Sequence, residues 1–223
     1  MTIALEALPN AQEASRRAAA VVAERARAAV ATRGRSAIAF SGGSTPASML
    51  RALADEDVPW ASVALYQVDE RVAAAGHPDR NLTMLLTSLP ADARASVRPM
   101  PVEEHDLERA AVGYAELLPE RLDLVHLGLG ADGHTASLVP DDPVLQVRDR
   151  PVAITGEYQG RRRMTLTYPA LDGAREVLWL VTGGDKRDAL GRLLERDPEI
   201  PASQVANPAQ LVVADEAAAT DRR

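Results

Sequence analysis

The stretch LDLVHLGLGADGHTASLVP, residues Leu122–Pro140, passes from an apolar run into a glycine-rich turn. Residues 122–128 are apolar apart from Asp123 and His126, and this length is sufficient for one strand. Nearly continuous apolar runs of this kind are typical of parallel strands that helices cover on both faces. The stretch therefore indicates an α/β fold in which this strand lies inside a parallel sheet.

The turn after this strand combines backbone freedom with polar side chains. Gly130 and Gly133 permit positive φ angles, and we expect residues 135–137 to begin a helix whose free N–H groups attract anions. Asp132 and His134 lie in this turn, at the sheet edge where open α/β folds bind ligands. Glycine turns are common, so the turn alone is weak support for a site. The acid, the imidazole and the following hydroxyls together favour a functional loop in which His134 moves protons.

The segments on both sides of this loop repeat the order of strand, polar loop and helix. A first helix is expected from a cap at Asn10 to a stop at Gly34. Two strands joined by a glycine-containing turn are expected between residues 150 and 167, as a possible antiparallel addition. We predict one α/β domain over residues 1–223, with a mainly parallel, Rossmann-like sheet and helices on both faces. The other expected strands are 36–40, 63–68 and 176–181, and the other expected helices start at or near residues 46, 82, 107 and 186.

The composition limits the kinds of ligand and partner. A formal net charge of −7 argues against nucleic acid and acidic membranes, so a small anionic substrate needs local positive groups. The chain has no cysteine, and its four histidines lack a paired metal-ligand spacing. No apolar run reaches the ~18 residues of a membrane helix, and the N-terminus carries acids where a signal peptide has basic residues. We expect a cytoplasmic protein that holds no metal ion.

Two further loops place polar residues after expected strands. SGGSTP, residues 41–46, offers N–H groups and hydroxyls that suit a phosphate group. Capping by Thr45, with Pro46 at the first helical position, is an equally good interpretation of the same residues. Asp69 and Arg71 follow the strand 63–68 and suit sugar hydroxyls or a phosphate, whereas a surface ion pair is the ordinary interpretation of such a triplet.

Three more residues have a structural and a functional interpretation. Arg163 ends a run of three arginines, and such a run is ordinarily a solvated face. Lys186 is the only lysine among 25 basic residues, which is either an accident of codon composition or a compact ammonium in a phosphate pocket. Asn81 is expected to cap the helix 82–89.

Four motifs in order resemble one enzyme family. GLGADGHTASLVP, residues 128–140, resembles the signature of the 6-phosphogluconolactonases. SGGSTP at 41–46 resembles their phosphate loop, VDER at 68–71 with HPDRN at 77–81 resembles their second loop, and RMTLTYPAL at 163–171 resembles their later strand. The resemblance spans nearly the whole chain. Its local departures are Ala73 and Ala74 in place of Val-Pro, Arg80 in place of Ser and Val139 in place of Phe.

The resemblance implies a phosphosugar isomerase/deaminase-like fold and hydrolysis of 6-phospho-D-glucono-1,5-lactone in the oxidative pentose phosphate pathway. It implies that His134 is the general base, that Asp132 orients it or binds a hydroxyl, and that no cofactor is required. The partner is then the small-molecule phosphosugar lactone, and the expected assembly is a monomer or a homodimer. The implied substrate-binding residues are Gly42, Gly43, Ser44, Thr45, Asp69, Arg71, Gly130, Gly133, Thr135, Arg163 and Lys186.

Two alternatives share these motifs. An aminosugar-phosphate deaminase or isomerase has a similar Asp-Gly-His loop, with an acid at the place of Asp69. The continuation HTASL and the presence of Arg71, where those enzymes usually carry an aromatic residue, argue against it. A non-catalytic phosphosugar sensor would share the fold, but sensors of that kind often carry a DNA-binding segment, which this acidic chain lacks.

Overall fold

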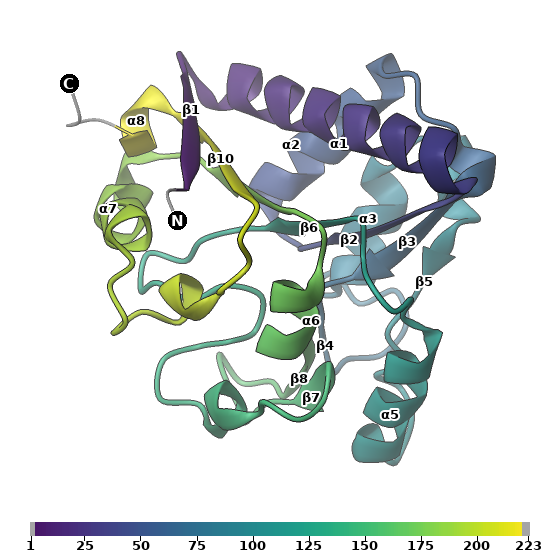
Figure 1. Ribbon diagram of the computed structural model, residues 1–223. Coiled ribbons are helices and arrows are strands. Elements are labelled where there is room, and N and C mark those ends of the chain that lie inside the picture. The colour runs from purple at the N-terminus through teal and green to yellow at the C-terminus, as the bar shows by residue number, and fades with distance from the viewer. Residues whose placement is uncertain (1–2, 220–223) are drawn as a thin grey trace.

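Residues 3–219 form a seven-stranded parallel sheet and a three-stranded antiparallel sheet (Figure 1). The computed structural model describes residues 3–219, so the outermost residues of the domain expected over 1–223 lie outside it. The α/β prediction, including the antiparallel addition, is confirmed. In spatial order the main sheet consists of β1 (Ala4–Leu8), β10 (Gln210–Asp215), β9 (Val177–Val181), β6 (Leu124–Leu127), β2 (Ser36–Phe40), β3 (Val63–Gln67) and β5 (Val97–Arg98). The small sheet consists of β4 (Asp69–Arg71), β8 (Arg163–Leu166) and β7 (Val152–Ile154).

Helices cover both faces of the main sheet. One buried cluster joins one sheet face to the first four helices, and a second cluster joins the opposite face to the last four. The first group is α1 (Ala11–Arg33), α2 (Ser44–Ala52), α3 (Asn81–Ser88) and α4 (Ala91–Arg94); the second is α5 (Leu107–Leu117), α6 (Tyr168–Gly173), α7 (Arg187–Glu195) and α8 (Glu216–Ala219). Short 3-10 helices are η1 (Leu53–Asp55), η2 (Trp60–Ser62), η3 (Pro143–Gln146), η4 (Gly184–Lys186) and η5 (Pro201–Gln204). Within residues 3–219, no helix combines the length and the apolar character that a bilayer crossing needs.

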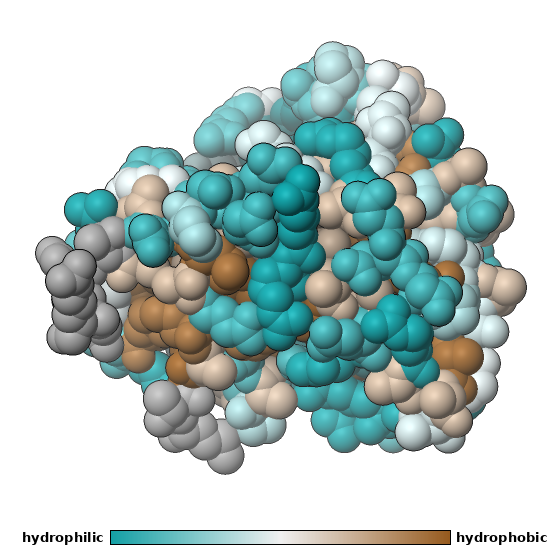
Figure 2. All heavy atoms as spheres, turned by 90° about the horizontal axis from the view of Figure 1, so that it is seen from above, coloured by the Kyte–Doolittle hydropathy of each residue, from teal (hydrophilic) through white to brown (hydrophobic). Residues whose placement is uncertain are grey.

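The first helix has the two ends that its sequence predicts. The Asn10 side chain accepts a hydrogen bond of 3.0 Å from the Glu13 backbone N–H, and Gly34 ends the helix with φ 74°. Its buried side carries mostly alanine and valine, which lets the helix lie close to the sheet. Hydrophilic side chains predominate on the outward side of the molecule where this helix lies (Figure 2).

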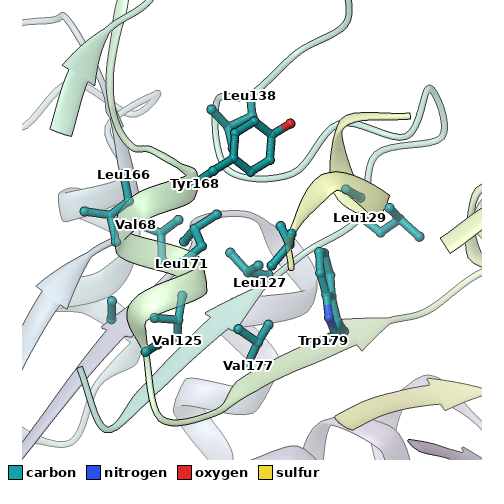
Figure 3. Close-up of a cluster of buried hydrophobic side chains, with 14 of the residues drawn as sticks. Val68, Val125, Leu127, Leu129, Leu138, Leu166, Tyr168, Leu171, Val177 and Trp179 are labelled. Atoms are coloured by element: carbon teal, nitrogen blue, oxygen red, sulfur yellow. The ribbon is translucent and has the colours of Figure 1, made fainter. Parts of the chain in front are cut away.

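The second buried cluster packs the small sheet against the main sheet. Val125 and Leu127 of β6 and Trp179 of β9 lie in one cluster with Tyr168 and Leu171 of α6 (Figure 3). The Tyr168 hydroxyl also donates a 3.0 Å hydrogen bond to the carbonyl of Pro201. The segments that carry the two sheets are therefore packed together at the carboxyl end of β6.

Two sequence predictions about local structure are wrong. No helix begins at residues 135–137, because Ala136 has φ 53° and the chain there forms a tight turn closed by a bridge between Thr135 and Leu138. Asp69 and Arg71 do not lie in a loop, because residues 69–71 form β4 and pair with β8.

Two predicted helix caps are also wrong. Gly43, not Thr45, is the N-cap of α2, so Pro46 is the third helical residue rather than the first. Asn81 is the first residue of α3, and Arg80 occupies the cap position. The Asn81 side chain makes its hydrogen bonds elsewhere, at the candidate site.

Candidate active site

A cavity of about 230 Å³ opens where the strands of the main sheet end at their carboxyl edge. The loop after β2, the loop after β6 and the segment after β9 contribute to its wall, and the small sheet closes it. Of the residues predicted from the sequence, those that line the cavity are Gly42, Gly43, Ser44, Thr45, Asp69, Arg71, Gly130, His134, Arg163 and Lys186. Asp132, Gly133 and Thr135 do not line it.

His134 and Asp132 form a close pair at the mouth of this cavity. His134 Nδ1 lies 2.5 Å from Asp132 Oδ1, and the His134 backbone N–H donates to the same oxygen at 3.2 Å. Partial burial raises the pKa of the Asp132 carboxyl, but its hydrogen bonds with His134 outweigh burial and hold that pKa below its ordinary value. A carboxylate at Nδ1 fixes the ring with its proton on that nitrogen, so Nε2 carries the lone pair. Among residues 3–219, Nε2 has no hydrogen-bond partner.

The two glycines of this loop are needed for the pair to form. A Cβ at Gly130 would lie 2.1 Å from His134 Nδ1 and 2.5 Å from Asp132 Oδ1. Gly133 has φ 81°, and a Cβ there would lie 2.5 Å from the Cβ of Ile200. Both glycines therefore shape the loop by lacking a side chain.

The loop is anchored to the core on both sides of His134. Thr135 is buried, and its hydroxyl donates a 2.8 Å hydrogen bond to the carbonyl of Gly128, which gives it a structural role. Leu129 and Leu138 belong to the buried cluster that also holds Tyr168 (Figure 3). The imidazole is thus carried by a rigid turn.

Asp69 lies at the centre of a buried hydrogen-bond network. Its carboxylate accepts a 2.6 Å bond from the Ser137 hydroxyl and a 3.0 Å bond from Asn81 Nδ2. The Asn81 amide oxygen in turn accepts a hydrogen bond from Arg71, whose guanidinium also donates to the Asp79 carbonyl at 2.9 Å. Asn81 therefore links the acid to the cation.

Sequence reasoning missed Asn81 and Ser137 as parts of the site. Asn81 lies in the HPDRN motif, but its position before a helix favoured a cap, and Ser137 appeared to belong to a helix start. Asn81 also explains one glycine of the phosphate-like loop, because a Cβ at Gly42 would lie 1.8 Å from its Oδ1.

Arg163 is a buried cation facing the cavity. It pairs in register with Arg71 across β8 and β4, and its side chain donates to Gln159 Oε1 at 3.2 Å and lies 4.9 Å from the Tyr158 ring. Burial lowers the pKa of its guanidinium, against the opposing effect of Asp69. Its Nε is buried with no hydrogen-bond partner among the described residues. Two neighbouring guanidiniums with spare donors favour an anion between them.

The other end of the cavity carries smaller polar groups. Lys186 is about a quarter exposed and lies 3.3 Å from Asp185 Oδ2. The hydroxyls of Thr45 and Thr182 are 3.0 Å apart, and Thr182 was not predicted from the sequence. The helix α2 begins at Ser44 beside them, with free N–H groups in its first turn. The lining thus has three cations and one carboxylate, in a chain whose net charge is −7.

Nothing in the geometry of the described residues marks a metal site. Within residues 3–219, no three His, Asp or Glu side chains gather as metal ligands would. The arrangement consists of a carboxylate-bound imidazole and a surrounding set of anion-binding groups.

An imidazole among cationic side chains at the carboxyl edge of the sheet is an arrangement suited to an α/β protein that binds a small anionic ligand. The family model described as glucosamine-6-phosphate isomerases/6-phosphogluconolactonase matches residues 9–214. A 6-phosphogluconolactonase of Synechocystis sp. is 37% identical over 175 residues, which cover 70% of this chain and 71% of that relative. The chain belongs to the glucosamine-6-phosphate isomerase/6-phosphogluconolactonase family.

Solved structures show that both branches of the family share this fold. A 6-phosphogluconolactonase from Shewanella baltica superposes with a TM-score of 0.86 at 23% identity, covering 96% of this chain and 97% of its own. A monomeric glucosamine-6-phosphate deaminase superposes with a TM-score of 0.84 at 17% identity, covering 99% and 100% of the two chains. The fold alone therefore does not separate the lactonase from the deaminase.

Proposed function

We propose that this chain is a 6-phosphogluconolactonase that hydrolyses 6-phospho-D-glucono-1,5-lactone to 6-phospho-D-gluconate, with His134 as its general base. The observation that carries the proposal is the His134–Asp132 pair, at 2.5 Å, on a rigid turn beside a cationic cavity. The Synechocystis relative, with the same activity in its name, supports the choice of branch. The reaction belongs to the oxidative pentose phosphate pathway.

The chemistry begins with the lone pair on His134 Nε2. This nitrogen takes a proton from a water molecule as the water oxygen attacks the lactone carbonyl carbon. The resulting imidazolium is stabilised by the Asp132 carboxylate. When the tetrahedral intermediate collapses, the bond from carbon to the ring oxygen breaks, and the imidazolium returns the proton to that oxygen. The product is an open-chain acid with a new hydroxyl.

The oxyanion of the intermediate needs positive groups. The backbone N–H groups of Gly130 and Gly133 already donate within the turn, to the carbonyls of His134 and Gly130, at 2.8 and 3.0 Å. These two amides are therefore not free to donate to the oxyanion. Arg71, the lining cation that is not assigned to the phosphate, takes over the stabilisation of the developing charge.

The substrate is held at its two polar ends. The phosphate is bound by Arg163, Lys186, the hydroxyls of Ser44 and Thr45 and the first N–H groups of α2. Sugar hydroxyls donate to the Asp69 carboxylate, while Gly42, Gly43 and Gly130 shape the remaining wall. The enzyme acts without a cofactor, in the cytoplasm, as a monomer or a homodimer of single-domain chains.

A deaminase or isomerase is the second candidate, because it shares the fold. In that chemistry an acid at the position of Asp69 would exchange protons with a substrate carbon. Here both carboxylate oxygens of Asp69 accept hydrogen bonds from Ser137 and Asn81, which favours a fixed acceptor over a proton carrier. A non-catalytic sensor would bind the phosphosugar without turnover.

The decisive assay is pH-stat titration of freshly generated phosphogluconolactone, corrected for spontaneous hydrolysis. We expect rapid acid release by the wild-type protein, and a fall in kcat of about 10²- to 10⁴-fold in His134→Asn. Affinity for 6-phosphogluconate should change little in that variant, because the phosphate contacts lie elsewhere.

Each alternative predicts a different result when the protein is also given glucosamine 6-phosphate and tested for binding of 6-phosphogluconate. Release of ammonia from glucosamine 6-phosphate, with no lactone hydrolysis, would favour the deaminase. Binding of phosphogluconate without any turnover would favour the sensor. A His134→Asn variant with nearly normal turnover would refute the general-base assignment while leaving the lactonase activity itself intact.

A further inference from the structure

A tight turn between the antiparallel strands β7 and β8 lies beside the candidate active site. Tyr158 and Arg161 close this turn with two backbone hydrogen bonds, of 3.0 and 3.3 Å. Its two central residues both have positive φ, 52° at Gln159 and 75° at Gly160. None of the residues 158–161 lines the active-site cavity, yet Tyr158 and Gln159 contact groups that the proposed mechanism uses.

The Tyr158 side chain contacts three of these groups at once. Its hydroxyl lies 3.4 Å from Asp132 Oδ2, the carboxylate oxygen that is not bonded to His134. Its ring meets the His134 imidazole edge-on, with 5.8 Å between the ring centroids and an angle of 61° between the planes. The Arg163 guanidinium lies over the same ring, 4.9 Å from its centroid. One side chain therefore links the proposed general base and its carboxylate to the proposed phosphate cation.

Each of these contacts restricts its partner. Burial and the charge of Asp132 raise the pKa of the Tyr158 hydroxyl against the smaller opposing effect of Arg163, so the hydroxyl is protonated at neutral pH and donates to the carboxylate. With Oδ1 bonded to His134 and Oδ2 to Tyr158, the Asp132 carboxylate is held at both oxygens. The ring limits rotation of the imidazole on one side and attracts the guanidinium to its face.

Gln159 has a backbone conformation that its residue type does not favour. Positive φ at both central positions is typical of a type I′ hairpin turn, where asparagine or aspartate before glycine is the usual choice. Here the longer side chain reaches Arg163, whose Nη2 donates to Gln159 Oε1 at 3.2 Å. Backbone strain retained beside a cavity is a reason to expect a functional role.

The turn is also attached to the segment that carries the second cation of the cavity. Arg161 donates to Asp79 Oδ2 at 3.2 Å from Nε and at 3.0 Å from Nη2, and its Nη2 lies 3.3 Å from His77 Nε2. The carbonyl of Asp79 accepts a hydrogen bond from Arg71, the cation proposed to stabilise the oxyanion. These contacts restrict the position of the turn relative to the cavity, as a positioning role requires.

We propose that Tyr158 and Gln159 are positioning residues of the lactonase reaction. Tyr158 holds the His134–Asp132 pair in its reactive geometry, and both residues hold Arg163 in place for the phosphate. The inference rests on the proposed lactonase function. Neither residue lines the cavity, so each acts through the groups that it contacts. Tyr158 therefore affects both kcat and phosphate binding, whereas Gln159 affects phosphate binding alone.

Two substitutions of Tyr158 separate its hydroxyl from its ring. Tyr158→Phe keeps the ring and should lower kcat about two- to fivefold with unchanged affinity for 6-phosphogluconate, because a 3.4 Å hydrogen bond is long and weak. Tyr158→Leu also removes the ring, and it should lower kcat about tenfold or more and weaken 6-phosphogluconate binding about two- to fivefold. Tyr66→Phe is the matched control, because it removes a hydroxyl that donates to Leu117 outside the cavity lining, and its kcat should be normal.

Double variants show whether these effects pass through the proposed contacts. In an Asp132→Ala background, Tyr158→Phe should lower kcat no further, because the partner of the hydroxyl is already absent. In an Arg163→Ala background, Tyr158→Leu should weaken 6-phosphogluconate binding no further. Lactone titration measures kcat and calorimetry measures binding. A general loss of folding would instead lower the melting temperature and would add to the effect of either background.

The test of Gln159 compares binding with stability. An asparagine side chain is one methylene shorter and suits a type I′ turn better. Gln159→Asn should therefore weaken 6-phosphogluconate binding about two- to fivefold, while the melting temperature stays the same or rises. A purely structural role would make binding and stability fall together.

Three outcomes would overturn the inference, and each differs from a failure of the proposed function. The first is normal kcat and normal binding in Tyr158→Leu. The second is an equal loss of kcat on Tyr158→Phe with and without Asp132. The third is normal 6-phosphogluconate binding in both Tyr158→Leu and Gln159→Asn. A wild-type protein that does not hydrolyse the lactone would refute the proposed function and the effect on kcat with it, and the binding measurements would still decide the role of both residues at Arg163.

Discussion

Asn81 shows how one side chain organises the candidate site. Its amide nitrogen donates to Asp69, its amide oxygen accepts from Arg71, and its position leaves no room for a side chain at Gly42. The acid and the cation come from β4, whereas the phosphate-like loop follows β2, so two separate segments of the chain meet at Asn81. A single residue therefore sets their relative positions, which a cap at a helix start would not do.

Arg163 and Arg162 allow a test of the phosphate contact by adjacent residues. Arg163→Ala should weaken 6-phosphogluconate binding by about 10- to 100-fold, because it removes a buried charged donor that faces the cavity. Arg162 is half exposed and lies 3.9 Å from Glu108, so Arg162→Ala should bind normally. Calorimetric titration of both variants checks this, and unchanged affinity in Arg163→Ala would show that the wrong arginine was chosen.

Unphosphorylated gluconolactone is the control for that experiment. It lacks the group that Arg163 is proposed to bind, so it should bind poorly to the wild type and be nearly unaffected by Arg163→Ala. A large loss with this compound would instead indicate that the variant disturbs the whole cavity.

Two substitutions of Lys186 are needed to separate the effect of its charge from the effect of its compact shape. If its compact ammonium contacts the phosphate beside Gly183, which has φ 99°, a planar guanidinium should fit poorly. Lys186→Arg should then show much of the loss of kcat/KM that Lys186→Ala shows. Steady-state kinetics of the two variants side by side decide the matter. Wild-type values for both would remove Lys186 from the site and leave codon composition as the reason for the single lysine.

At the level of elements, the C-terminal end of α1 depends on one glycine. Gly34 has φ 74°, a conformation that costs an L residue about 1 kcal/mol, and open space surrounds the position of its missing Cβ. Gly34→Ala should therefore lower the free energy of unfolding by about 1 kcal/mol through backbone conformation alone. Denaturant unfolding measures the change.

Gly113 is the matched control for that substitution. It lies inside α5 with equally open space at its missing Cβ, but with ordinary helical φ. Gly113→Ala should raise the free energy of unfolding by about 0.5–1 kcal/mol, because alanine favours the helix. The same sign of effect for both glycines would mean that φ does not explain the difference.

The elements that the sequence predicts well are those with a strong periodic pattern. The strands 36–40 and 63–68, and the first helix with its Asn10 and Gly34 ends, depend on apolar runs and local capping groups. The short strand Asp69–Arg71 has no such pattern. It forms because β8, almost a hundred residues later in the chain, supplies its hydrogen-bonding partner.

The sequence predicted most of the residues that line the candidate site, but it did not predict how the backbone and the hydrogen bonds arrange them. Most predicted residues line the cavity, because motifs at strand ends meet at one edge of a parallel sheet. The turn at Ala136 was missed, since a positive φ at alanine leaves no signal in the sequence. Thr182 and Ser137 were missed because their partners, Thr45 and Asp69, are distant in the chain.

At the scale of the whole molecule, the main sheet keeps one titratable group at its centre. His126 lies on β6, between β2 and β9, and is completely buried beside Phe40. Neither ring nitrogen has a hydrogen-bond partner among the described residues. Burial lowers the pKa of His126 to about 3, so the folded protein holds this ring neutral down to acidic pH.

This burial should make the folded state sensitive to acid. The unfolded chain binds a proton at His126 near the ordinary pKa of about 6.5, whereas the folded chain binds it only near 3, so stability is lost as pH falls through this window. Between pH 7 and pH 4.5 the loss in free energy of unfolding should be on the order of 2–3 kcal/mol from this group.

His126→Leu should remove that loss and, by deleting two unsatisfied polar atoms, stabilise the protein by about 1 kcal/mol at pH 7. Urea unfolding of wild type, His126→Leu and His105→Leu, the same change at an exposed histidine, measures the effect at each pH. If the free energy of unfolding falls by the same amount between pH 7 and pH 4.5 in all three proteins, a group other than His126 limits the stability of the fold in acid.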